Sequence, residues 1–290
     1  MRMKKCFVFI VMSFICIRLI GMNSNSAHAE DLDIVNRPVN SYGMTGILST
    51  TAPYTIPKGT FEIGASVVSE SSVTPDYTIL QYPLIITNGL SEHSEIALRG
   101  TYYNIKEGPT VTAPIYRKAG TLELSYKWNF FSAPEDSTFP SIALIVAGIV
   151  PQERNNDIRI NAVSHWGMRV GFSVGKELSW RDHMLAVYAD GQMVGQDMTE
   201  KRLRDIYEVF NAGLLFPISR YRNLQLLFEY RLVYGKETIT IDGGDYSAMT
   251  YGLRMVSEKF NLTMGTQFIR KKVEGFENSN KVIGLISAKF

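Results

Sequence analysis

Few side chains in this chain have the types and spacing that catalysis requires. Ser164 and His165 are adjacent, and two aspartates of a distant segment, Asp242 and Asp245, could supply an acid. A serine nucleophile needs a positioned base and an orienting acid, whereas adjacent residues of a strand point to opposite faces. The chain also has no GxSxG, phosphate-loop or dinucleotide motif. We therefore expect no enzyme activity, and a barrel enzyme that uses His165 ranks third, after a channel and a non-conducting barrel.

Metal ligation finds equally little support. Both cysteines, Cys6 and Cys16, lie within the first 29 residues, and the later histidines, His93, His165 and His183, lack the spacing of a zinc site. The sequence therefore predicts no metal site and no cofactor.

Charged side chains are more informative, because they alternate with apolar ones. Between residues 121 and 130, large apolar residues occupy one set of alternate positions and Glu123 and Lys127 the other, and residues 223–232 repeat the pattern. Successive side chains of a strand point to opposite faces, so each segment has an apolar and a charged face. Alternation predicts the following inward-facing charged residues: Glu62, Glu95, Arg99, Glu123, Lys127, Arg169, Glu229, Arg231 and Arg254.

This set permits two interpretations. Mixed charges of both signs are typical of a polar pore wall that passes hydrophilic solutes. The same residues could instead form salt bridges that fill a modest barrel, since about twelve strands lies between a filled barrel of eight and a water-filled barrel of sixteen. The sequence leaves both interpretations open.

The elements that carry these residues are predicted to be twelve strands. Their expected ranges are 60–69, 77–87, 93–104, 119–131, 139–150, 166–177, 183–192, 206–216, 222–233, 246–256, 259–269 and 281–290. No apolar run after the N-terminal region is long enough for a helical membrane span. Strands in lipid must pair all their backbone groups, so the predicted fold is an all-β, antiparallel, up-and-down transmembrane β-barrel over residues 60–290.

The connections alternate in length, as in outer-membrane barrels. Short turns are expected at 87–92, 133–138, 177–182, 218–222 and 257–259. Longer connections are expected at 105–118, 151–165, 193–205, 234–245 and 270–280. If the chain enters from the periplasm, the longer connections lie outside and both termini are periplasmic. The one compact outside loop is then the first, at 71–76.

The two ends of the chain carry targeting signals. Basic residues precede an apolar run that ends at Ile17, and Ala27 and Ala29 flank His28 in a small-x-small cleavage pattern. Residues 1–29 are therefore predicted to be a secretory signal peptide. The last ten residues alternate and end on Phe290, which resembles the signal that the outer-membrane barrel-assembly machinery recognises.

Residues 30–59 precede the first strand and are too apolar to remain solvated. We expect this N-terminal segment to tuck into the periplasmic mouth of the barrel and narrow it.

A stretch of this region resembles a known group. Residues 41–68, SYGMTGILSTTAPYTIPKGTFEIGASVV, contain Gly43, Gly46 and the triplet Pro57-Lys58-Gly59, and residues 88–100, NGLSEHSEIALRG, form a similar turn. These motifs resemble porin-like outer-membrane barrels and the YjbH-like barrels associated with exopolysaccharide export. The resemblance covers about a third of the chain and implies the barrel class, without any site residue to carry over.

The first hypothesis is an outer-membrane channel for small hydrophilic solutes or saccharides. The second is a non-conducting structural or export-accessory barrel for envelope polysaccharide. The expected partners are outer-membrane lipid and the barrel-assembly machinery. Nucleic acid is not expected, because a net charge of +2 in 290 residues gives no basic excess.

Overall fold

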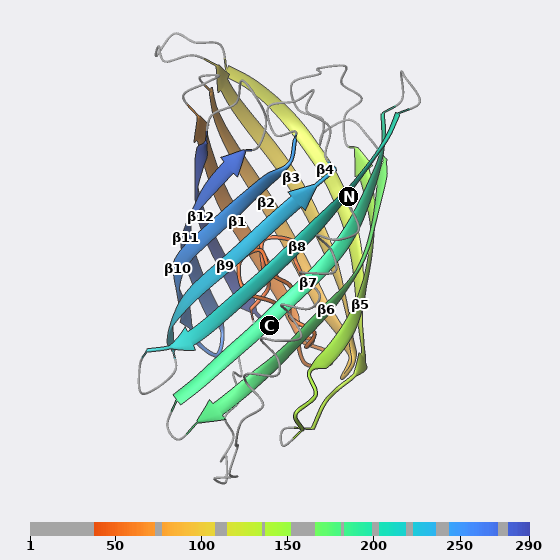
Figure 1. The fold of residues 1–290 in the computed structure, drawn as a ribbon, viewed down its shortest axis with the longest axis vertical. Helices are drawn as coiled ribbons and strands as arrows, with labels where there is room; N and C mark the ends of the chain where they lie inside the picture. The colour runs from red at the N-terminus through yellow and green to blue at the C-terminus, as the bar shows by residue number, and fades with distance from the viewer. Residues whose placement is uncertain are drawn as a thin grey trace, which may run out of the picture.

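The computed structural model describes ten stretches of the chain: residues 38–72, 77–107, 115–134, 137–151, 166–180, 183–198, 203–218, 223–235, 244–271 and 278–290. They form a closed barrel of twelve antiparallel strands (Figure 1). The strands are β1 Phe61–Ser72, β2 Tyr77–Ser91, β3 Ser94–Glu107, β4 Ile115–Phe131, β5 Ser141–Pro151, β6 Gly167–Trp180, β7 His183–Met198, β8 Leu203–Pro217, β9 Leu224–Tyr234, β10 Tyr246–Val256, β11 Phe260–Lys271 and β12 Ser279–Lys289. The predicted fold class and strand number are confirmed.

Each strand pairs with its neighbours along the chain, and the first strand pairs with the last. In this closing pair, Glu62 lies opposite Lys289 and Ser71 opposite Asn280. Phe61 and Phe290 exchange two backbone hydrogen bonds of 3.1 and 2.8 Å. Closure leaves the sheet without an unpaired edge, which a barrel in lipid requires.

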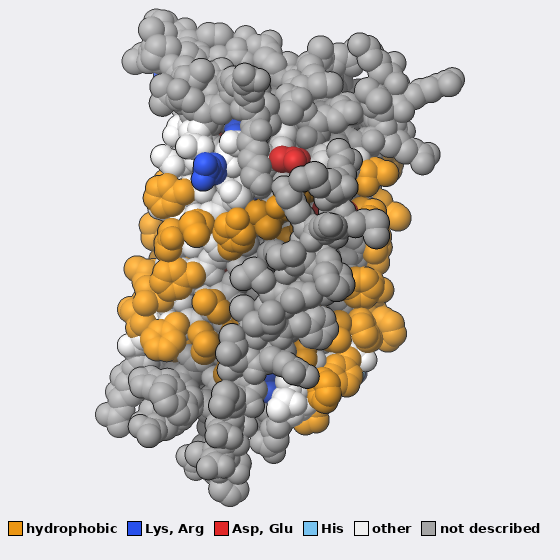
Figure 2. Space-filling view, viewed as in Figure 1, with side chains coloured by type: hydrophobic (Ala, Val, Ile, Leu, Met, Phe, Trp, Pro, Cys, Tyr) orange, Lys and Arg blue, Asp and Glu red, His pale blue; other side chains and the backbone are white. Residues whose placement is uncertain are grey.

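The outer surface of the barrel is apolar. Leu124, Trp128, Phe172 and Met264 each expose about half of their side chain. On the face shown in Figure 2, hydrophobic side chains lie across the middle of the molecule, and the visible charged side chains lie toward its two ends. Such a band suits hydrocarbon on the outside of the barrel. In the part of the chain that the structure describes, no helix is long and apolar enough to cross a membrane.

Several strands are longer than the alternation predicts, mostly at the end opposite the short turns. β4 begins at Ile115, because Lys106 still pairs with Ile115, and β7 continues to Met198, opposite Leu203. The expected long connection 193–205 is therefore reduced to residues 199–202, whereas residues 132–140 form a longer connection at the other end. The predicted strict alternation of long and short connections was wrong. Some hairpins continue beyond the apolar band, where lipid no longer requires an apolar residue at every second position, so the sequence pattern does not show where these strands end.

Residues 38–60, which we call the inner segment, lie inside the barrel; Figure 1 shows them in red to orange, enclosed by the strands. The segment folds on itself through isolated bridges that join Val39 to Thr45 and Gly46 to Thr51. Gly43 has a φ of 85°, which favours glycine, and a Cβ on Gly46 would overlap the carbonyl oxygen of Thr50. Both glycines are therefore needed for the tight path of the chain.

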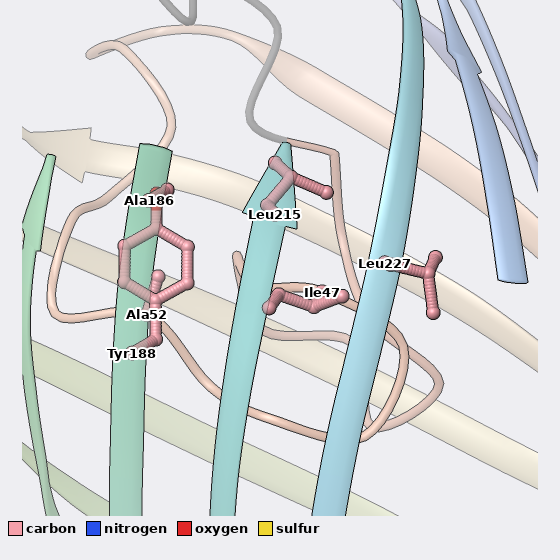
Figure 3. Close-up of a cluster of buried hydrophobic side chains, with 6 residues drawn as sticks. All are labelled: Ile47, Ala52, Ala186, Tyr188, Leu215 and Leu227. Carbon is pink, nitrogen blue, oxygen red and sulfur yellow. The ribbon is translucent and has the colours of Figure 1, made fainter. Parts of the chain in front are cut away.

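Two apolar clusters join the inner segment to the wall. In the first, Ile47 and Ala52 pack among four wall residues (Figure 3): Ala186, Tyr188, Leu215 and Leu227. In the second, Val39 and Leu48 pack among Val68, Ile85, Ile283 and Leu285. The interior is thus partly apolar, where alternation had predicted a polar wall.

Candidate functional site

The nine charged residues that alternation predicts to face inward fall into two groups in the structure. Five of them bond or pair at the inner segment: Glu62, Glu95, Lys127, Glu229 and Arg254. The other four, Arg99, Glu123, Arg169 and Arg231, line a cavity beyond this segment. The two groups have different chemistry, and we describe them in turn.

The most concentrated contact with the inner segment is made by Glu229 of β9. Its carboxylate accepts backbone hydrogen bonds from Leu48 at 3.1 Å, from Ser49 at 2.8 and 3.1 Å, and from Thr50 at 2.7 Å. Consecutive N–H groups that converge in this way form a concave anion site. Glu229 therefore fixes the turn at residues 48–50 to one side of the barrel.

The opposite side of the segment is held by an ion pair. Nζ of Lys127 lies 2.8 Å from the Glu95 carboxylate and donates to the carbonyl oxygen of Ala52 at 3.0 Å. Glu95 in turn accepts hydrogen bonds from the backbone N–H groups of Thr45 at 2.8 Å and Ile56 at 3.0 Å. Both charged side chains are fully buried, so the pair needs these additional bonds to offset desolvation.

Two more of the predicted residues complete this attachment. Arg254 of β10 donates to the carbonyl oxygens of Gly46, at 3.0 Å, and Ile47. Glu62 of β1 accepts from the backbone of Val39 at 3.3 Å. The segment is therefore bonded to strands from both the first and the second half of the chain.

Sequence reasoning missed other residues that bind the inner segment. Asp190 accepts a 2.7 Å hydrogen bond from the backbone of Thr51, and Ser173 donates to the Thr51 carbonyl oxygen at 2.5 Å. Thr87 donates to the carbonyl oxygen of Gly43 at 2.6 Å. Asp190 lies within the predicted strand 183–192. A charged residue among the apolar residues of this strand was the signal that could have identified it as inward-facing.

The second group lines a cavity of about 200 Å³ in the half of the barrel remote from the short turns. Odd-numbered strands contribute residues near their ends, such as Arg231, and even-numbered strands residues near their starts, such as Arg169 and Lys281. Tyr42 and Ser49 of the inner segment also line it. The cavity is therefore bounded on one side by the inner segment.

Three guanidinium groups converge on Tyr42 in this cavity. Their carbon atoms lie 5.3 Å (Arg99), 4.9 Å (Arg169) and 5.5 Å (Arg231) from the centre of its ring. The Nη1 group of Arg231 also donates to the Tyr42 hydroxyl. Such distances are within the range of cation–π attraction.

Among the described residues that line the cavity, Glu123 supplies the one carboxylate that can pair with these three cations. Its oxygen lies 3.7 Å from Arg99, and it also pairs with Arg169. Burial raises the pKa of Tyr42, but the charge and hydrogen bond of Arg231, with the charges of Arg99 and Arg169, leave that pKa below its ordinary value. The outward side of the inner segment is therefore electropositive.

The described part of the chain does not include the serine and histidine of the catalytic hypothesis. Ser164, His165 and Asp242 lie outside the described residues, as do Ala27, Ala29 and the rest of the predicted signal peptide. Within the described ranges, no group of three or more histidine, cysteine or acidic side chains could hold a metal ion.

The barrel resembles solved outer-membrane proteins. An outer-membrane channel from Pseudomonas putida F1 gives a TM-score of 0.62 at 11% identity, over 82% of this chain and 98% of the channel. The NanC porin gives a TM-score of 0.50 at 9% identity, over 79% of this chain and all of the porin. No family model and no curated protein matches the chain. At these identities the likeness establishes a common fold, that of outer-membrane β-barrels.

Proposed function

We propose that this protein is an outer-membrane channel for small hydrophilic solutes and that the inner segment closes its lumen. The apolar band on the barrel fits lipid on all sides, and proteins of the same fold include outer-membrane channels. In this proposal residues 1–29 direct secretion, the barrel-assembly machinery recognises the strand that ends at Phe290, and both termini lie in the periplasm.

The observation that carries the proposal is that a separate segment lies inside the barrel. Leu227, Ala186 and Leu285 point inward and are buried in clusters with Ile47 or Leu48. Side chains of the wall fill a barrel of eight strands, whereas a wider barrel leaves a lumen. Removal of residues 38–55 would therefore leave these wall residues facing an open space.

The contacts also suggest how the channel is closed and opened. Non-covalent bonds to Glu229, Lys127 and Arg254 attach the segment, so it can detach without breaking the sheet. A solute that enters from outside would first reach the cavity above Tyr42 and would pass only after the inner segment moves. We therefore assign Glu62, Glu95, Lys127, Glu229 and Arg254 to closure, and the remaining charged residues to contact with the solute.

The decisive experiment is single-channel recording in a planar bilayer. The protein purified from membranes is compared with a variant that lacks residues 38–55. We expect rare or small current steps from the full protein and large, ohmic steps from the deletion variant. Heat-modifiable migration on gels establishes that both are folded barrels. Equal conductance of the two folded proteins would contradict closure by the inner segment.

A second candidate is a non-conducting barrel that serves envelope polysaccharide export, as the YjbH-like resemblance implies. The buried Glu95–Lys127 pair and the bonds to Glu229 favour it, because a segment held this firmly need never leave. Under this alternative the full protein passes no current under any voltage or solute. The deletion variant could still conduct, so the recording on the full protein separates the two proposals.

A further inference from the structure

The arginines around Tyr42 have more hydrogen-bonding capacity than their surroundings use. Each guanidinium carries five N–H donors. In the part of the chain that the structure describes, the buried Nε groups of Arg99, Arg169 and Arg231 find no acceptor. Leaving a buried donor unsatisfied is costly and calls for a specific explanation.

The partners that are present do not satisfy these donors. Tyr42 offers one hydroxyl oxygen, which accepts from Arg231, and otherwise presents the face of its ring. Glu123 is divided between Arg99 and Arg169. Lys281, which also lines the cavity, has its own carboxylate, since Glu70 lies 2.9 Å from its Nζ. The three arginines therefore retain an excess of positive charge and free donors.

We infer that the cavity above Tyr42 binds a small oxyanion, with Arg99, Arg169 and Arg231 as its ligands. Guanidinium groups pair with carboxylate and phosphate oxygens in a planar, often bidentate geometry. A cavity of about 200 Å³ is smaller than the sites that hold drug-sized ligands, so a solute the size of a dicarboxylate fits better than an oligosaccharide. Tyr42 forms the floor of the site and belongs to the segment proposed to close the channel.

This inference extends the proposed function by giving the solute a chemical class. In that sense it rests on the channel proposal, but binding itself does not require conduction. An anion that draws the arginines away from Tyr42 would also weaken one attachment of the inner segment. The site would then select the solute and promote opening at the same time.

The first test is equilibrium binding to the protein purified from membranes in detergent. Succinate and its uncharged counterpart succinamide differ in charge but little in size, and inorganic phosphate provides a second oxyanion. At constant ionic strength, we expect succinate or phosphate to give saturable heats in titration calorimetry and to raise Tm, whereas succinamide does neither.

Variants locate the site. Because a hydrogen bond to a charged group contributes about 1.5–3 kcal/mol, Arg231→Gln should weaken oxyanion binding by about ten- to hundredfold. Arg270→Gln removes the same charge from an exposed position of β11 and should bind as the unmodified protein does. Arg99→Gln replaces the first variant if Arg231→Gln does not fold.

The outcomes separate this inference from the channel proposal. Oxyanion binding that Arg231→Gln weakens and Arg270→Gln does not, with or without current, supports the site. Binding without current would contradict the channel proposal and still support the oxyanion site. Equal responses to succinate and succinamide, or equal losses in both variants, would overturn the inference even if the protein conducts.

Discussion

Replacement of Glu229 by glutamine should release the inner segment while keeping the shape of the side chain. The carboxylate accepts hydrogen bonds from three consecutive backbone N–H groups, of Leu48, Ser49 and Thr50. Glutamine keeps one carbonyl oxygen, loses the charge and places an amide donor against these donors. Charged hydrogen bonds contribute about 1.5–3 kcal/mol each and neutral ones about 1, so the docked state should lose about 2–4 kcal/mol.

Hydrogen exchange measures this loss directly. Exchange through local opening accelerates about tenfold for each 1.4 kcal/mol of lost stability. Amides in a peptide covering residues 38–60 of Glu229→Gln should therefore exchange about 30- to 1000-fold faster, while the strands keep their protection. Exchange is read by mass spectrometry, independently of any current.

A matched control makes the result specific to the inner segment. Glu70→Gln is the same chemical change at a buried residue of β1 whose carboxylate contacts the wall residues Lys281 and Ser279. It should leave exchange in residues 38–60 unchanged. Unchanged exchange in Glu229→Gln, or equal acceleration in both variants, would refute the view that Glu229 holds the segment in place.

Three further predictions concern the barrel and the path of the segment. Leu124→Arg, on the exposed face of β4, should lower the unfolding free energy in lipid vesicles by about 2–4 kcal/mol, whereas Glu258→Arg in the turn after β10 should lower it by at most about 1; equal losses would contradict the lipid-facing assignment. Gly46→Ala should increase hydrogen exchange of the inner segment, because its Cβ has no room, while Gly148→Ala, with open space around the added Cβ, should not. Deletion of Phe290 should reduce the folded, heat-modifiable fraction recovered from outer membranes, and normal recovery would argue against its role in assembly.

Alternation predicted the number and order of the strands. Every second residue of a strand contacts lipid and must be apolar, and this requirement leaves a period-two pattern in the sequence. Alternation is weakest in the second, fifth and eighth predicted strands, 77–87, 139–150 and 206–216, although all three are present in the structure as β2, β5 and β8. Ile85 of β2 and Leu215 of β8 face inward and pack against the inner segment. β2 and β8 are apolar on both faces because one face contacts lipid and the other contacts the inner segment, and the pattern of a single strand cannot reveal the second contact.

The candidate site was only partly predictable for a related reason. Alternation along each strand predicted that Glu229, Arg231 and seven other charged residues face inward. It could not predict which of these residues contact one another. The division into residues that hold the inner segment and residues that line the cavity depends on the path of residues 38–60. Nothing in the sequence around Tyr42 indicated that three arginines surround its ring.

The covalent link between the inner segment and β1 has a further consequence. Residues 57–60 lead directly into the first strand and are held by backbone hydrogen bonds between Gly59, Thr60 and Gly89, so a detached segment stays within reach of its site. Short tethers give effective concentrations in the millimolar range. A synthetic peptide of residues 38–56 would accordingly have to reach about millimolar concentration to close the deletion variant. Closure by the tethered segment is thus independent of protein concentration. After a solute has passed, the inner segment can rebind inside its own barrel.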